Sequence, residues 1–144
     1  MQRKNVLLAA LMVLIGLVIS GVATAQDNSV IDAILAEEEL TYRNASYLLL
    51  SADGTPPAES EIGSAYPPDH ALNLGEYSLM VMQTFDIPGG AMYTFTGMPR
   101  YAARELAFRD IVQGRAYPTM KLSGERALRI VGRVLTLQEE GRLR

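Results

Sequence analysis

The sequence predicts an all-α protein, a small helical bundle built from two similar helix-loop-helix units. Apolar residues recur at intervals of three and four in several segments, which is the spacing of one face of a helix. The connections between these segments contain proline and glycine, which end helices. Two segments also resemble each other, LNLGEYSLMVMQTF at residues 72–85 and KLSGERALRIVGRVL at residues 121–135.

Residues 1–25 have the composition of a secretory signal peptide. Arg3 and Lys4 precede an apolar run over residues 6–19, and Ala23-Thr24-Ala25 fits the small-x-small cleavage pattern, so we expect cleavage before Gln26. The alternative is an uncleaved anchor, because about 20 apolar residues are enough to cross a bilayer. The chain has no cysteine, which excludes both a lipoprotein anchor and disulfide bonds. An exported protein of this kind must be held together by its core.

Five helices are predicted after the leader. They are an N-terminal helix in segment 26–42, capped by Asn28 or Ser29, a second from Thr41 through Leu50, a third over 75–85, a fourth over 100–111, and a fifth from Ser123 to at least Leu135. The proline-rich segment 52–71 and the segment 91–99 are predicted to be loops. Residues 138–144 form a charged tail that we expect to fray.

The repetition divides segment 43–137 into two units, residues 43–85 and 100–136. Each unit reads as helix, loop, Gly-Glu, helix. A unit of this size cannot bury its apolar face alone, so each copy is expected to complete the core of the other. The Gly-Glu helix of the first unit is apolar on nearly all sides, which predicts that it is the central, most buried element.

The second unit resembles an S-layer homology repeat. Such repeats combine an Ala-rich helix, a glycine turn, a proline-containing loop, a Thr/Ser-Arg-Ala-Glu motif and an amphipathic helix. The comparable residues here are Ala102, Leu106, Ile111, Gly114, Pro118, Ser123, Glu125 and Leu135. A glycine, Gly75 or Gly124, stands where the motif has its arginine. The resemblance implies a noncovalent module of the bacterial cell envelope, which holds secondary cell-wall polymers or peptidoglycan in grooves between repeats.

Charge is divided unevenly along the chain. Residues 26–99 contain eleven acidic side chains and one basic one, whereas residues 100–144 contain ten basic and five acidic ones. The basic half is predicted either to meet an anionic partner or to pair with the acidic half, including Glu37, Glu38 and Glu39. The net negative charge argues against nucleic acid as a partner.

Arginines near loop tyrosines form the candidate binding surface, because the guanidinium group pairs with carboxylates and phosphates and aromatic rings suit sugars. The candidates are Arg100, Arg104, Arg126, Arg129, Arg133, Tyr101 and Tyr117. A second set is the helix-start motif, Gly75, Glu76, Ser123, Gly124 and Glu125. Ser123 is expected to cap its helix. Leu74 aligns with Ser123, which predicts that the first copy has lost its cap.

No catalytic or metal-binding pattern accompanies these residues. His70 is the only histidine and lacks the companions that a metal site needs. We therefore expect a non-enzymatic protein without cofactor, exported to the periplasm or cell surface, that binds cell-wall polymer or peptidoglycan. It would have no membrane span after signal cleavage. The alternative function is a periplasmic adaptor or assembly subunit whose partner is another envelope protein.

Overall fold

The computed structural model describes residues 28–54 and 65–143, and the predicted signal peptide lies outside them. The chain divides into two units, Met1–Ala33 and Ile34–Arg144. The described part is all-helical, with no strand and only two isolated bridges, Thr41 with Ala71 and Asn73 with Lys121. The predicted fold class is confirmed.

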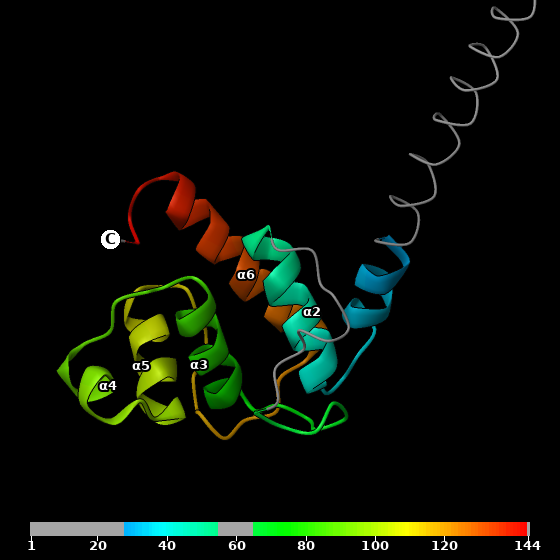
Figure 1. Cartoon of the computed structure of the whole chain (residues 1–144), viewed down its shortest axis with the longest axis horizontal. Helices are drawn as coiled ribbons and strands as arrows, with labels where there is room; N and C mark the ends of the chain where they lie inside the picture. Colours follow the sequence, from blue (N-terminus) through cyan, green and yellow to red (C-terminus); the bar gives the residue numbers. More distant parts are fainter. Residues whose placement is uncertain (1–27, 55–64, 144) are drawn as a thin grey trace, which may run out of the picture. The chain divides into compact units, whose positions relative to one another are not determined.

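Residues 28–35 are helical, and residues 36–41 form a non-helical connection. The other helices are α2 (Tyr42–Asp53), α3 (Leu74–Thr84), α4 (Ala91–Thr96), α5 (Pro99–Phe108) and α6 (Gly124–Glu139) (Figure 1). Four of them fall close to the predicted positions. The exception is α4, which occupies a segment predicted to be a loop.

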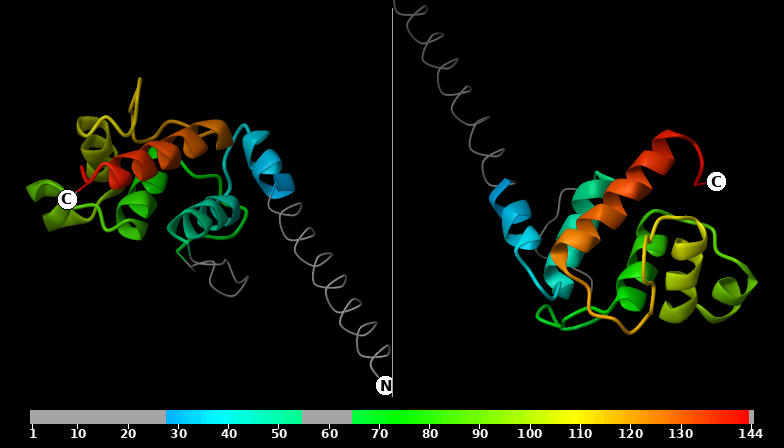
Figure 2. Two further views of the ribbon diagram at one scale, coloured as in Figure 1. Left: turned by 90° about the horizontal axis from the view of Figure 1, so that it is seen from above. Right: turned by 180° about the vertical axis from the view of Figure 1, so that it is seen from behind.

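The central position of α3 is confirmed. It packs against α5 on one side and α2 on the other, and α2 also packs against α6 (Figures 1 and 2). Tyr77 and Val81 of α3 are fully buried, and the Tyr77 hydroxyl donates a hydrogen bond of 3.2 Å to the main-chain oxygen of Ala127 in α6. Helices of one repeated unit therefore pack on helices of the other.

Three connections meet where α2, α3 and α6 begin. We call this place the junction (residues 37–41, 70–75 and 118–124), and it includes the first residues of α3 and α6. The Leu40 amide donates to the Leu122 oxygen at 2.7 Å, and the Leu72 amide donates to the Leu40 oxygen at 2.9 Å. The Leu74 amide donates to the Met120 oxygen at 2.9 Å. The leucine side chains at positions 40, 72, 74 and 122 are buried beneath these bonds. Main-chain pairing and apolar burial thus fix the starts of three helices together.

The C-terminal segment differs from the prediction of a fraying tail. α6 continues to Glu139, four residues beyond Leu135, and Leu143 after it is buried. The Arg142 amide donates to the Leu137 oxygen at 2.9 Å, so the chain turns back at Gly141, whose φ is 68°. A left-handed glycine after a helix is a common way to end it, and here it returns one apolar side chain to the core.

Candidate anion-binding groove

The helix-start motif has a structural role at the starts of both α3 and α6. The Ser123 hydroxyl accepts a hydrogen bond from the Arg126 amide at 3.4 Å, which confirms the predicted cap. The prediction that the first copy lacks a cap is wrong. Asn73 accepts from the Glu76 amide at 2.9 Å, and the Glu76 carboxylate accepts from the Asn73 amide at 3.0 Å, so α3 begins with a complete capping box.

The two glycines of the motif lie against main chain. The Gly124 amide donates to the Glu37 oxygen at 3.0 Å, and the Gly75 amide donates to the Pro118 oxygen at 2.8 Å. A Cβ atom on Gly75 would lie 3.1 Å from that same oxygen, and one on Gly124 would lie 2.6 Å from the carbonyl carbon of Ile34. Glycine therefore allows the close approach of main chain at the junction.

Three of the predicted binding residues, Arg126, Arg129 and Arg133, line one groove along α6. It is a cavity of about 190 Å³. Its floor is apolar because Ile111 and Ile130 are buried. The full lining is Ile111, Gln113, Arg126, Arg129, Ile130, Gly132, Arg133 and Thr136. The remaining predicted residues do not reach this groove.

Arg126 is held by the protein itself. Its guanidinium group donates to the main-chain oxygens of Gln113, at 3.3 Å, and of Arg115, and it contacts the Met120 sulfur at 3.1 Å. Burial, and secondarily the charge of Arg129, lower the pKa of Arg126 below the ordinary arginine value. Arginine nevertheless stays protonated in proteins, so Arg126 braces the connection after α5 and adds positive charge at one end of the groove.

Arg129 and Arg133 differ in their partners. Arg129 donates to the Glu125 carboxylate at 2.6 Å, and both side chains are well exposed, so solvent weakens the pair. The Arg133 side chain makes no hydrogen bond or ion pair within the described residues, and its Nε atom is buried without a partner. A buried donor without an acceptor is costly. Arg133 is therefore the side chain of the groove that lacks the acceptor a bound anion would supply.

The other predicted binding residues lie elsewhere, and the single surface expected from the sequence is not formed. Tyr101 and Arg104 of α5 line a separate hollow of about 420 Å³ between α4 and α5. The guanidinium carbon of Arg100 lies 5.1 Å from the centre of the Tyr101 ring. Tyr117 is exposed in the connection before α6 and lines neither the α6 groove nor the hollow between α4 and α5.

Of the two alternatives for the basic half, pairing with the acidic half occurs through Lys121, whereas none of the α6 arginines forms an ion pair with Glu37, Glu38 or Glu39 in the described residues. Glu39 pairs with Lys121 across the junction. Glu37 accepts from the Asn44 side chain at 2.6 Å. Attraction between the acidic and basic halves therefore acts at the junction and not on the groove of α6.

The structure adds groove residues that the sequence did not single out. Thr136 lies three residues after Arg133, so helical spacing alone places both on one face. Its hydroxyl donates to the Gly132 oxygen at 2.9 Å. Gln113 follows the end of α5, and no sequence pattern around it predicts a place in the groove. The chain reaches the groove through the turn at Asp110, whose φ is 56°.

His70 belongs to a small aromatic cluster away from the groove. Its ring stacks on Tyr66 with centroids 4.7 Å apart, and Nε2 lies 3.3 Å from the Glu76 carboxylate. Among the described residues no group of three or more His, Cys, Asp or Glu side chains is placed to hold a metal ion.

No protein-family model, curated protein or solved structure matches this chain. None of the helices in residues 28–54 and 65–143 is long and apolar enough to cross a membrane. The candidate groove is thus described by its own chemistry.

Proposed function

We propose that this chain is a non-enzymatic, exported envelope protein that binds an anionic cell-wall polymer through the α6 groove. The observation that carries the proposal is Arg133, a guanidinium group with an unpaired buried Nε on the wall of a cavity. Arginine binds phosphate and carboxylate groups with two parallel hydrogen bonds. Such a group on a polymer would supply the missing acceptor.

The size of the groove favours a polymer over a free small molecule. Pockets that enclose drug-sized ligands measure roughly 300–1,000 Å³, whereas this cavity holds about 190 Å³. It has room for one charged group and part of a sugar, while the rest of the ligand would run along the surface. Arg126 and Arg129 extend the positive charge toward the start of α6, which suits a chain with repeated anionic groups.

Export rests on the leader-like residues 1–25, and a role at the wall agrees with the resemblance to S-layer homology repeats. The alternative function remains a periplasmic adaptor that binds another envelope protein and no carbohydrate. The two proposals differ in whether isolated wall material retains the protein.

The test is retention on purified peptidoglycan sacculi, with and without their covalently attached anionic polymers, over a range of salt concentrations. We expect retention that falls as salt rises, because exposed charges are screened. The double variant Arg129→Ser, Arg133→Ser should bind at least about a hundredfold more weakly, as each charged hydrogen bond contributes about 1.5–3 kcal/mol.

Arg43→Ser is the matched control. It removes one exposed positive charge from α2, and Arg43 does not line the α6 groove. It should bind as the parent protein does. Unchanged retention of the double variant would reject the α6 groove as the site. Absence of retention by the parent protein on every sacculus preparation, with recovery of a protein partner, would establish the adaptor function instead.

A further inference from the structure

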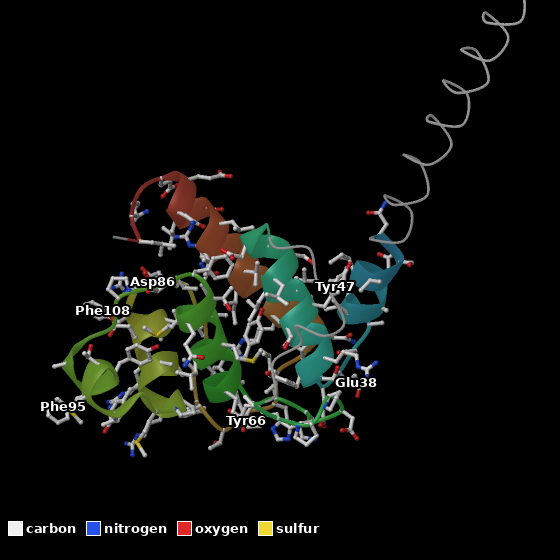
Figure 3. The ribbon with its side chains drawn as sticks, in the orientation of Figure 1. Glu38, Tyr47, Tyr66, Asp86, Phe95 and Phe108 are labelled. Carbon is white, nitrogen blue, oxygen red and sulfur yellow. The ribbon has the colours of Figure 1, made fainter. Side chains whose placement is uncertain are left out.

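The segment from the start of α4 to the end of α5 exposes an unusual number of large apolar side chains. Six such side chains are exposed in the described residues, and four of them belong to this segment, namely Met92, Phe95, Met98 and Phe108. We call these four the α4 patch. Phe95 is 93 % exposed and Phe108 is 87 % exposed. Figure 3 shows both rings at the outer edge of the molecule in this view, pointing away from α3.

The short helix α4 buries none of its residues and lies against α5 on the side away from α3 (Figures 1 and 2). Burial in the core therefore does not explain its apolar side chains. Exposed apolar clusters on soluble proteins commonly mark surfaces that contact a partner or a membrane.

Several polar groups at α4 are paired within the helix and with α5. Thr96 donates its hydroxyl to the Met92 oxygen at 2.7 Å, and Thr94 donates to the Gly90 oxygen at 3.2 Å. The Gly90 amide donates to the Glu105 carboxylate at 3.0 Å. A polar group that keeps its hydrogen bond costs much less to move out of water. α4 can thus leave water without breaking these bonds.

Positive charge flanks this apolar surface. Arg100 and Arg104 lie one turn apart on α5, are exposed, and have no ion pair within the described residues. Glu105 on the same helix is neutralised by Arg109, with Nε and the carboxylate oxygen 3.1 Å apart. Asp86 and Asp110 follow the C-terminal ends of α3 and α5, so the N-terminal end of α5 carries the positive charge.

We propose that the α4 patch is a membrane-contact surface that inserts into the interface of an anionic lipid bilayer. Phe95 and Met98 would enter between the headgroups, while Arg100 and Arg104 pair with lipid phosphates. Projecting aromatic residues with arginines beside them are typical of proteins that lie on a membrane without spanning it. Each arginine near an anionic surface is worth roughly a fivefold gain in affinity. This contact is independent of the polymer groove on α6.

The experiment measures binding of the exported protein, as isolated from cells, to vesicles of phosphatidylcholine, alone or mixed with phosphatidylglycerol. We expect sedimentation with the mixed vesicles and little with the neutral ones. The variant Phe95→Ser, Met98→Ser should bind at least about tenfold more weakly because it removes the inserted area. The variant Arg100→Gln, Arg104→Gln should lose the preference for anionic vesicles. Leu35→Ser, which removes an exposed leucine outside the patch, should bind as the parent protein does.

A fluorescent probe separates insertion from surface attraction. The chain contains no tryptophan, so Phe95→Trp introduces a single tryptophan whose fluorescence can be followed. Its emission should shift to shorter wavelength when the mixed vesicles are added. Binding that survives Phe95→Ser, Met98→Ser, or an unshifted emission from the Phe95→Trp variant, would overturn the proposal. The proposal would also be overturned if the parent protein did not bind vesicles and the Phe95→Ser variant lost binding to a protein partner or to a second copy of the chain. The patch variants should keep their retention on sacculi, which distinguishes failure of this proposal from failure of the α6 groove.

Discussion

Alanine at position 124 would place a methyl group where α6 begins at the junction. The new Cβ would lie 2.6 Å from the carbonyl carbon of Ile34, with the carbonyl oxygen closer still. Both atoms are main chain, so neither can rotate away. The methyl group would push α6 outward and so break the 3.0 Å hydrogen bond from the Gly124 amide to the Glu37 oxygen.

The expected loss of stability can be estimated from these two effects. Overpacking in a tight site costs about 1–3 kcal/mol, and a lost buried hydrogen bond costs about 1 kcal/mol. We therefore expect Gly124→Ala to reduce the free energy of unfolding by about 2–4 kcal/mol. A methyl group on Gly132 of the same helix would meet no heavy atom within 4 Å. Gly132→Ala should instead stabilise the protein by about 1 kcal/mol, because glycine is a poor helix former.

The assay is urea unfolding followed by circular dichroism of the helices. With a slope of about 1–3 kcal/mol per molar urea, the midpoint of Gly124→Ala should fall by at least about 0.7 M, whereas that of Gly132→Ala should rise. Equal midpoints for Gly124→Ala and the parent protein would show that the helix start is not packed on main chain, and the account of the junction would be wrong.

Three further substitutions test the core and the caps by the same unfolding assay. Tyr77→Phe should cost about 1 kcal/mol by removing the bond to the Ala127 oxygen. Burial raises the pKa of Tyr77, so only the unfolded chain releases this proton near pH 10, and the free energy of unfolding falls above that pH by up to about 1.4 kcal/mol per pH unit. Tyr77→Phe should therefore show a shallower fall of stability between pH 9 and pH 11. An identical slope would argue against burial of the hydroxyl. Asn73→Ala should cost about 1 kcal/mol and more than Ser123→Ala, whose bond to the Arg126 amide is longer at 3.4 Å; the reverse order would mean that the capping box of α3 contributes little.

The helices with a buried face were predictable because their apolar spacing reports contact with the core. α3 and α6 begin within one residue of the expected positions. α4 was missed because it has no buried face and therefore no periodic apolar signal; it is bounded instead by Gly90 and by Gly97, whose φ is 58°. The cap of α3 was missed because the alignment on Gly-Glu matched Leu74, not Asn73, with Ser123.

The candidate site was predictable only where it lies on a single helix. Helical spacing brings Arg126, Arg129 and Arg133 together without any knowledge of tertiary structure. The separation of Arg104 from this group follows from the packing of α5 on α3, which places it beside α4. No local pattern reports which side of α3 a neighbouring helix will occupy.

The junction makes the two halves of the chain depend on each other for their backbone partners. The first half supplies the Leu40 and Leu74 amides, and the second half supplies the oxygens of Leu122 and Met120 that accept from them. A break between α4 and α5 would leave these donors and their acceptors on different fragments. The fragments should be poorly ordered separately and regain structure when mixed. This is the behaviour expected of two similar units that complete each other and are not autonomous domains.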